Sequence, residues 1–338
     1  MTRQTVLVLG AHGLLGRFTA RAFHAAGYQV LRAGRRPEST EYYRRVDLDR
    51  AESLATLLEG VDLVVSSVED PQMRVERVVL RRGGLLLQAN VPASDRRAVA
   101  AALAAECSTE TIGTVGTNIG LSGISSLVLR DLLEQHPEAD AAELAYVICL
   151  AGSTGPGGAQ FAHRVLTAHP APRTVRRLFP APFGERHCFD LGVLDECLLS
   201  PAILGQRRLN TYLAIAERPV NGWLRLLNRL GLLRRLPAFM FSGAARLRPA
   251  PIELTREPIS ARLAVYKRGR LLAARGLQAE GDYNASVQST LHIARVLLAR
   301  GPGALPRGIH AIEDLLRLTE LRDGLKADRV LISDLPIE

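Results

Sequence analysis

The sequence predicts an α/β protein in which a doubly wound parallel sheet is followed by a second domain containing antiparallel strands. Three observations predict this fold class. An apolar strand runs into a glycine-rich turn and a helix at the start; strands and helices then alternate up to residue 117; beyond residue 140, strands are separated by stretches rich in glycine and proline. Such alternation implies right-handed crossovers and a parallel sheet. A chain of 338 residues also exceeds the usual size of one hydrophobic core, which favours two domains.

The elements of the first part follow from its hydrophobic pattern. Strands are predicted over 5–9, 28–33, 61–65, 85–88 and 110–115, and helices over 14–26, 51–58, 73–81 and 95–105. The stretch 61–65 is almost continuously apolar, which is typical of a strand buried on both faces. Helices between such strands would cover both faces of the sheet.

The second part has a different pattern. Helices are predicted over 124–135, 161–167 and 284–299, and strands over 144–150, 252–254, 260–267 and 270–276. The last two strands would form a hairpin joined at Arg268 and Gly269. A long irregular stretch is predicted around four prolines, namely Pro170, Pro172, Pro180 and Pro182.

The most informative stretch is 6–16, where a strand ends in the pattern G-x-x-G-x-x-G and a helix begins. Glycines in this order let the backbone turn sharply and let a pyrophosphate approach the N-terminus of the helix. The free N–H groups and the helix dipole there favour a phosphate. The alternative is a strand-to-helix turn that needs glycine only for close packing. We predict a Rossmann-type dinucleotide-binding turn formed by Gly10, His12, Gly13, Leu14, Leu15 and Gly16.

The end of the second strand selects between the two nicotinamide dinucleotides. Sites for NAD place an Asp or Glu about 20 residues after the glycines, where it holds the ribose 2′-hydroxyl. Here the corner over 32–36 reads Arg-Ala-Gly-Arg-Arg and contains no acid. Arginine offers bidentate hydrogen bonds to a 2′-phosphate, so we predict NADP(H) as cofactor with Arg35 and Arg36 on that phosphate. A solvated turn with two charged residues is the alternative, and it would leave NAD possible.

Further cofactor contacts are expected beyond the carboxyl ends of the strands, where ligands sit in such sheets. Ser66 and Ser67 would line the middle of the cofactor, and Asn90 and Asn118 would lie near the nicotinamide. Asp47, after the third strand, is a candidate acceptor for the adenine amino group. An equal alternative for this segment is that Asp49 caps the helix that follows.

Candidate proton donors come from the second domain. Short-chain dehydrogenases share the glycine turn but need Tyr-x-x-x-Lys, and none of the seven tyrosines here has a lysine four residues later. Hydride transfer needs little beyond positioning and a proton source, and imine reduction can start from a protonated iminium. The candidate catalytic residues are Tyr212, His187 and His163, although each histidine is more often a surface or core residue.

Several segments resemble the saccharopine dehydrogenase-like (saccharopine reductase) family. They are the glycine turn, the segment 120–124, the long insertion before a C-terminal helix, and the closing segments 281–287 and 306–310. The resemblance implies a Rossmann domain over 1–120, a substrate and dimerisation α+β domain of mixed sheet over 121–280, and C-terminal helices over 281–338 that complete the Rossmann domain. It also implies reduction of imines, or of activated carbon–carbon double bonds in lipid-like or carrier-bound substrates.

These observations together predict an NADP(H)-dependent reductase for a small-molecule substrate, acting in bacterial specialised metabolism as a homodimer in the cytoplasm. Because no proton donor stands out, the alternative is a non-catalytic sensor that binds NADP(H) and a partner without turnover. The four cysteines are scattered without metal-ligand spacing, so we expect reduced thiols and no metal. No apolar run is long enough for a transmembrane helix.

The net charge of +9 comes almost wholly from arginines that are spread along the chain. We therefore expect no nucleic-acid partner, which would favour a clustered basic patch. One basic segment, 223–236, is amphipathic. Its apolar face comprises Trp223, Leu226, Leu227, Leu230 and Leu233, with Arg225 and Arg229 off that face. We expect this segment to pack on its own domain or on a second subunit; contact with a membrane or a lipid-like substrate is the alternative.

Overall fold

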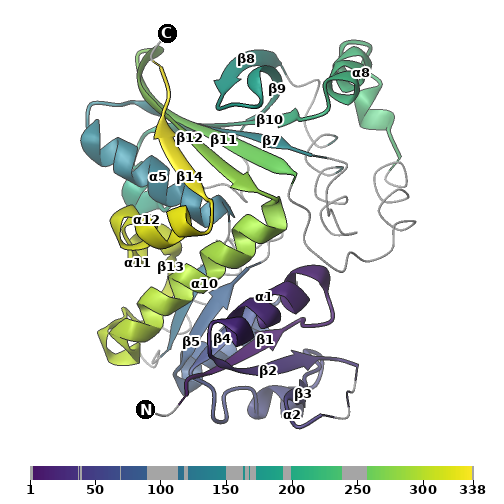
Figure 1. Cartoon of the computed structure of the whole chain (residues 1–338), viewed down its shortest axis with the longest axis vertical. Helices are drawn as coiled ribbons and strands as arrows, with labels where there is room; N and C mark the ends of the chain where they lie inside the picture. The colour runs from purple at the N-terminus through teal and green to yellow at the C-terminus, as the bar shows by residue number, and fades with distance from the viewer. Residues whose placement is uncertain are drawn as a thin grey trace. The chain divides into compact units, whose positions relative to one another are not determined.

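We analysed a computed structural model of the chain. It describes residues 3–36, 38, 40–68, 70–89, 113–117, 121–149, 163, 167, 173–192, 199–237 and 257–336. The chain divides into two compact units. Unit 1 comprises Met1–Leu127 and Ser286–Leu325, and unit 2 comprises Val128–Ala285 and Lys326–Glu338. Two seven-stranded sheets, here called sheet A and sheet B, run through the described residues, as Figure 1 shows.

Sheet A is parallel throughout. Its strands are β1 (Thr5–Leu9), β2 (Gln29–Gly34), β3 (Tyr43–Arg45), β4 (Leu63–Ser66), β5 (Leu85–Gln88), β6 (Thr114–Thr117) and β13 (Gly308–Ala311). Their spatial order is β13-β6-β5-β4-β1-β2-β3, so the direction of winding reverses between β1 and β4. Leu9 at the end of β1 is level with Ala33 on β2 and Ser66 on β4. Ligands bind at such reversal points, beyond the carboxyl ends of the strands.

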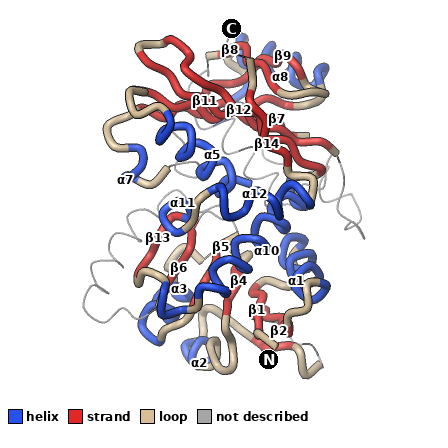
Figure 2. The backbone as a smooth tube through the Cα atoms, turned by 60° about the vertical axis from the view of Figure 1, so that its left-hand side comes forward, coloured by secondary structure: helices blue, strands red, loops and turns tan. Residues whose placement is uncertain are grey.

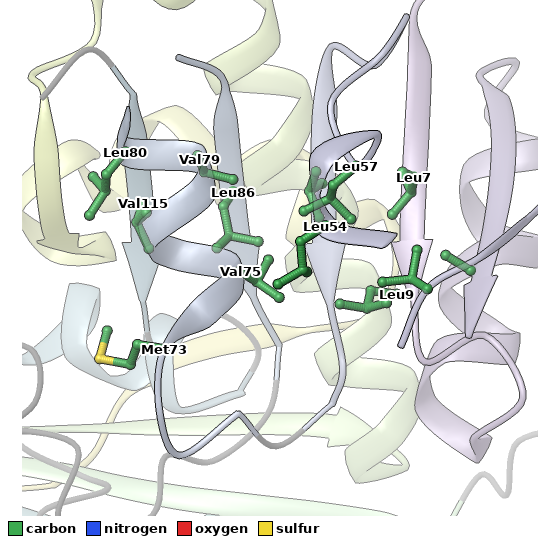
Figure 3. Close-up of a cluster of buried hydrophobic side chains, with 13 residues drawn as sticks. Leu7, Leu9, Leu54, Leu57, Met73, Val75, Val79, Leu80, Leu86 and Val115 are labelled. Carbon is green, nitrogen blue, oxygen red and sulfur yellow. The ribbon is translucent and has the colours of Figure 1, made fainter. Parts of the chain in front are cut away.

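Helices cover sheet A because its side chains are apolar on both faces. On one face α2 (Ala51–Ala55) and α3 (Arg74–Arg82) pack against β1, β4, β5 and β6, as Figure 3 shows. This contact includes Leu7, Leu9, Val64, Leu86, Leu54, Leu57, Val75 and Val79, all less than a tenth exposed. Helix α1 (Leu14–Ala25) contacts β1 and β2. The C-terminal part of the chain supplies β13 and α11 (Ile312–Leu315) to unit 1.

Sheet B is mixed. Its strands are β7 (Ala141–Ile148), β8 (Thr174–Phe179), β9 (Gly184–Gly192), β10 (Arg208–Ile215), β11 (Pro258–Lys267), β12 (Arg270–Glu280) and β14 (Leu331–Asp334), drawn red in Figure 2. They lie in the order β14-β12-β11-β7-β10-β9-β8, and only the β7–β10 pair is parallel. The β11–β12 hairpin turns at Arg268 and Gly269, both with positive φ, as a two-residue hairpin loop requires.

The remaining helices are α5 (Leu121–Gln135), α7 (Pro201–Leu204), α8 (Arg218–Arg229), α10 (Asp282–Arg300) and α12 (Leu318–Ala327), with 3₁₀ turns η2 (Leu233–Arg235) and η3 (Pro302–Ala304). Arg275 on β12 binds Asp131 and Gln135 on α5, which ties that helix to one face of sheet B. Among the helices that the structure describes, none combines the length and the hydropathy that a membrane span requires.

The predicted fold class is confirmed: a parallel doubly wound sheet, a second mixed sheet, and C-terminal elements that return to the first unit. The prediction of an irregular stretch around Pro180 is wrong. Residues 174–192 form the β8–β9 hairpin, with Pro180 and Pro182 in its turn. Arg177 points to the buried face of β8, so the apolar alternation that marks a strand is broken there.

Strand β10 was not among the predicted elements. The helix predicted over 223–236 begins earlier, at Arg218, and ends at Arg229. The predicted helix over 95–105 and the predicted strand over 252–254 lie outside the described residues. The domain boundaries at 120 and 280 stay a prediction.

Leu86 tests the packing of sheet A, because its side chain is fully buried under α3. We expect Leu86→Ala to lower the free energy of unfolding by about 2–5 kcal/mol, through the lost transfer energy and the cavity. The matched change Leu331→Ala, at a site 46% exposed on β14, should cost about 0.5 kcal/mol or less. Urea unfolding followed by circular dichroism measures both, and equal effects would contradict the described core.

Candidate dinucleotide site and a polar cluster in the second unit

The backbone reverses sharply where β1 ends. Gly10 has φ +84°, a conformation that side chains with a Cβ rarely adopt. The N–H groups of Gly10 and Ala11 both donate to the carbonyl of Ala33 on β2, at 2.9 and 3.2 Å. The N–H of Gly13 then donates to the Gly10 carbonyl at 2.9 Å. The chain is thereby folded tightly against the neighbouring strand before α1 begins.

Gly16 lets α1 approach this turn closely. A Cβ at this position would lie 2.3 Å from the Gly10 carbonyl oxygen and 2.7 Å from Ser67 Oγ. Ser67 in turn donates its hydroxyl to the carbonyl of Leu9 at 2.8 Å. Close helix–strand packing is the role of the third glycine in dinucleotide-binding turns. Close packing of α1 against β1 is thus expected both for a dinucleotide-binding turn and for a turn that needs glycine only for packing.

The start of α1 offers N–H groups to an anion. Gly13 is its N-cap and supplies no side-chain cap, and no acidic residue stands in the first turn of this described helix. The first helical hydrogen bond runs from the N–H of Arg17 to the Gly13 carbonyl. Leu14 and Leu15 are half-buried, while His12 and Gly13 are exposed. Because no acidic side chain in the first turn of α1 offsets the positive end of the helix dipole, this helix start is suited to binding a phosphate group.

An acid that was not predicted lies near the corner after β2, where the ribose contacts are expected. Glu38 Oε1 lies 2.8 Å from His12 Nε2, and its other carboxylate oxygen binds the guanidinium of Arg32. The ring of His12 lies 5.5 Å from the ring of Tyr43, whose hydroxyl donates to the carbonyl of Arg36. Glu38 lies four residues after the end of β2 and 26 residues after His12 in the sequence. The contact between the two side chains therefore depends on the fold and could not be predicted from local sequence. The Glu38 carboxylate is engaged by two cationic or potentially cationic groups.

Arg35 and Arg36 are both exposed at this corner. Asp47 is held locally: its Oδ1 accepts the N–H of Asp49 at 3.2 Å, and its Oδ2 lies 3.7 Å from Arg50 Nε. The N-cap of α2 is Arg50, so the alternative in which Asp49 caps this helix is wrong. Adenine binding by Asp47 stays a prediction.

The carboxyl end of β5 lies beside that of β4. Gln88 pairs with Ser66, and both side chains are buried. Among the described residues the Gln88 Oε1 atom is buried without a hydrogen-bond partner, which is costly unless a ligand or water satisfies it. Asn90 and Asn118, the residues predicted to lie near the nicotinamide, fall outside the described residues.

Unit 2 contains a buried polar cluster on one face of sheet B. Glu143 is 1% exposed and accepts hydrogen bonds from Arg177, Arg262 and the hydroxyl of Tyr266. The Arg177 guanidinium also lies over the ring of Tyr212, 4.9 Å from its centroid. Two guanidinium groups share one carboxylate, so the cluster carries an excess positive charge.

Burial raises the pKa of the Tyr212 phenol, and the negative charge of Glu143 raises it further. Tyr212 therefore stays protonated at neutral pH, as a proton donor must. Cys188 belongs to the same buried group, and burial raises the pKa of its thiol to about 12. Such a thiol is unreactive.

The three candidate proton donors are not all gathered at one place. Cys188 packs with Tyr212, so the neighbouring side chain of His187 points to the opposite face of sheet B. Burial and the charges of Arg225 and Arg176 lower the pKa of His187. His163 Nε2 lies 2.9 Å from the carbonyl of Leu236. In the part of the chain that the structure describes, no group of three His, Cys, Asp or Glu side chains is placed to hold a metal.

Comparisons with known proteins bear on the first unit and on the fold. Residues 6–79, from β1 to α3, match the model of the NAD dependent epimerase/dehydratase family. No curated protein matches the chain. Among solved structures, the chain is similar to an amine dehydrogenase from Mycobacterium smegmatis, with 11% identity, a TM-score of 0.52 and coverage of 94% of this chain and 97% of that chain.

Two further structures are similar over nearly the whole chain. One is a meso-DAPDH mutant with DAP from Clostridium tetani E88, at 9% identity, a TM-score of 0.48 and coverage of 97% and 100%. The other is the C. glutamicum DAP dehydrogenase in complex with DAP, at 11% identity, a TM-score of 0.47 and coverage of 98% and 100%. At such identities the similarity concerns the fold. The resemblance to the saccharopine dehydrogenase-like family stays a prediction, while the match over 6–79 agrees with an NAD(P)-binding turn in unit 1.

Gly16 tests the dinucleotide turn. Gly16→Ala would place a Cβ 2.3 Å from a backbone oxygen, so α1 must move away from the turn. We expect its dissociation constant for NADPH to rise at least about tenfold in calorimetry, because the N–H groups at the start of α1 lose their alignment. The control Gly303→Ala enters open space in the same unit and should leave binding unchanged. Unchanged binding in a folded Gly16→Ala protein would contradict the assignment.

Glu143 tests the buried cluster. Glu143→Gln leaves two guanidinium groups without a carboxylate, so we expect a loss of about 3–5 kcal/mol in the free energy of unfolding. The control Glu185→Gln affects an exposed pair, in which Glu185 lies 3.6 Å from Arg176, and should cost about 1 kcal/mol or less. Denaturant unfolding measures both variants. A small loss for Glu143→Gln would show that the cluster is not held by its charges.

Proposed function

We propose that this protein is an NADP(H)-dependent reductase that transfers hydride to the C=N bond of an imine or to an activated C=C bond. The observation that carries the proposal is the glycine turn at the point where sheet A reverses its winding, where Gly16 lies against Gly10 and α1 begins without a cap. This combination suits a pyrophosphate bound by backbone N–H groups. The match of residues 6–79 to an NAD-dependent family model supports it.

The residues of unit 1 fit a dinucleotide. The start of α1, which has no side-chain cap, would hold the pyrophosphate. At the carboxyl end of β5, the buried Gln88 Oε1 has no hydrogen-bond partner among the described residues. Ser66 ends β4, the strand between β1 and β5, and Ser67 follows it. When bound, the reduced cofactor supplies the hydride.

The charges at the ribose-selecting corner favour the phosphorylated cofactor. Arg32, Arg35 and Arg36 lie close together in sequence at this corner, and the Glu38 carboxylate binds Arg32 and His12. A carboxylate engaged in this way is less available to the two ribose hydroxyls of NAD. Arg35 and Arg36 are exposed, so their guanidiniums can make charge-assisted hydrogen bonds with a 2′-phosphate.

Tyr212 is the proposed proton donor. Its raised pKa keeps the phenol protonated, and the neighbouring Arg177 would stabilise negative charge that develops on it during proton transfer. Imines are the first substrates to test, since an amine dehydrogenase shares the fold. The excess positive charge of the cluster around Glu143 favours substrates that also carry a carboxylate.

The proposal predicts tighter binding of NADPH than of NADH and turnover with imines or enones. We expect the double variant Arg35→Ala with Arg36→Ala to weaken NADPH binding by about tenfold or more and to leave NADH binding unchanged, because only NADPH carries the 2′-phosphate. The control is Arg295→Ala, an exposed arginine on α10. Calorimetry measures the two affinities, and cofactor oxidation is followed with a panel of cyclic imines and enones, with and without a carboxylate.

The outcomes separate the possible functions. Turnover that falls in Tyr212→Phe with an unchanged NADPH affinity supports Tyr212 as the proton donor. Tight NADPH binding without turnover of any imine or enone would favour the alternative, a non-catalytic NADP(H) sensor. Preference for NADH that reverses in Glu38→Gln would overturn the cofactor proposal, because Glu38 would then be the residue that holds the ribose.

A further inference from the structure

Helix α8 presents an apolar face outward. Trp223, Leu226 and Leu230 are 47%, 53% and 60% exposed, and Leu232 beyond the helix is 39% exposed. Leu227, on the same face, is half-buried. An exposed cluster of large apolar side chains on one helix is uncommon on a protein surface and marks a contact site. In Figure 1, α8 follows β10 at the end of sheet B.

The inward face of α8 is polar, and hydrogen bonds fix its orientation. Asn221 accepts the N–H of Ile215 at 3.2 Å and donates its amide to the carbonyl of His187 at 3.0 Å. Asn221 and Asn228 are both buried, and Leu224 is the one large apolar side chain that this helix buries. The buried Asn221 amide can make these two hydrogen bonds in only one orientation of α8. In that orientation Trp223 points outward.

The surroundings of this face are strongly basic. Residues 218–236 contain five arginines and no acidic residue. Arg218, Arg229 and Arg235 are exposed. The charge of Arg218 adds to burial in lowering the pKa of Arg186, and Arg225 acts likewise on His187. Two acids lie near this helix: Glu217 is its N-cap, and Glu185, whose charge acts on His187, lies 3.6 Å from Arg176.

We propose that the outward face of α8 docks on an anionic phospholipid surface, with Trp223, Leu226 and Leu230 entering the boundary between headgroups and acyl chains. Helices that lie in the membrane–water interface typically have apolar residues flanked by basic ones. The phosphate headgroups would neutralise the guanidinium charges. A second copy of the chain fits less well, because two-fold pairing of this face would bring arginines against arginines with no acidic partner in the segment. This inference does not depend on the proposed reductase activity.

The fluorescence of Trp223 tests the proposal directly, because it is the single tryptophan of the chain. The full-length protein is titrated with phosphatidylcholine vesicles, with and without phosphatidylglycerol. We expect a blue shift of the emission and co-sedimentation only with the anionic vesicles, weakened by added salt because the ionic contacts are screened. Quenching by brominated acyl chains would report the insertion of the indole.

Variants separate the apolar from the ionic contribution. Leu226→Gln with Leu230→Gln, and Arg225→Glu with Arg229→Glu, should each lower the vesicle partition coefficient at least about tenfold. The matched control Arg270→Glu with Arg295→Glu makes the same change in net charge at exposed sites elsewhere and should leave partitioning within about threefold, since the electrostatic effect is local.

Three results would overturn the proposal. One is a Trp223 emission that is unchanged by anionic vesicles. Another is an equal loss of partitioning in the control variant, because binding would then reflect net charge alone. The third is a protein that dimerises in solution and becomes monomeric in Leu226→Gln with Leu230→Gln, which would assign this face to self-association. NADPH binding by all variants should remain unchanged, and failure of the reductase proposal would leave these results unaffected.

Discussion

The close contact between Gly16 and the carbonyl of Gly10 is the constraint on which the first unit depends. With no Cβ in the way, α1 starts directly against the end of β1, and Ser67 on the next strand can bond to Leu9. Beside this turn, the ends of β1, β2 and β4 are level with one another at Leu9, Ala33 and Ser66. This backbone geometry suits the proposed binding of a pyrophosphate, which would make few demands on side chains.

Charge is distributed differently in the two units. At the corner after β2 in unit 1, Glu38 is bound by Arg32 and His12, and Arg35 and Arg36 are exposed. In unit 2, Glu143 is bound by the buried Arg262, the partly buried Arg177 and a tyrosine hydroxyl. Each cluster has more guanidiniums than carboxylates. The arginine-rich composition is thus used in specific places, where it favours anionic groups on ligands.

Local patterns were sufficient to predict the parallel sheet and the glycine turn, because both leave short-range signals. The strand predicted over 5–9 coincides with β1, and 85–88 with β5. Strand β8 could not be predicted in the same way, because Arg177 occupies a buried position to meet Glu143, which is 34 residues away. Glu38 likewise reaches His12 only through the fold. Contacts between charged residues that are distant in sequence leave no periodic hydrophobic pattern. The charged contacts of the candidate site were therefore predicted less completely than the fold.

The seventh strand of sheet A comes from residues 308–311, which pair with β6. During synthesis, the edge of β6 therefore stays unpaired until residues 308–311 have emerged from the ribosome. The intervening residues of unit 2 must emerge first, and they have their own sheet to form. An open edge of this kind is where a nascent chain is most exposed to wrong pairing, so chaperone dependence and sensitivity to deletion should centre on residues 308–311.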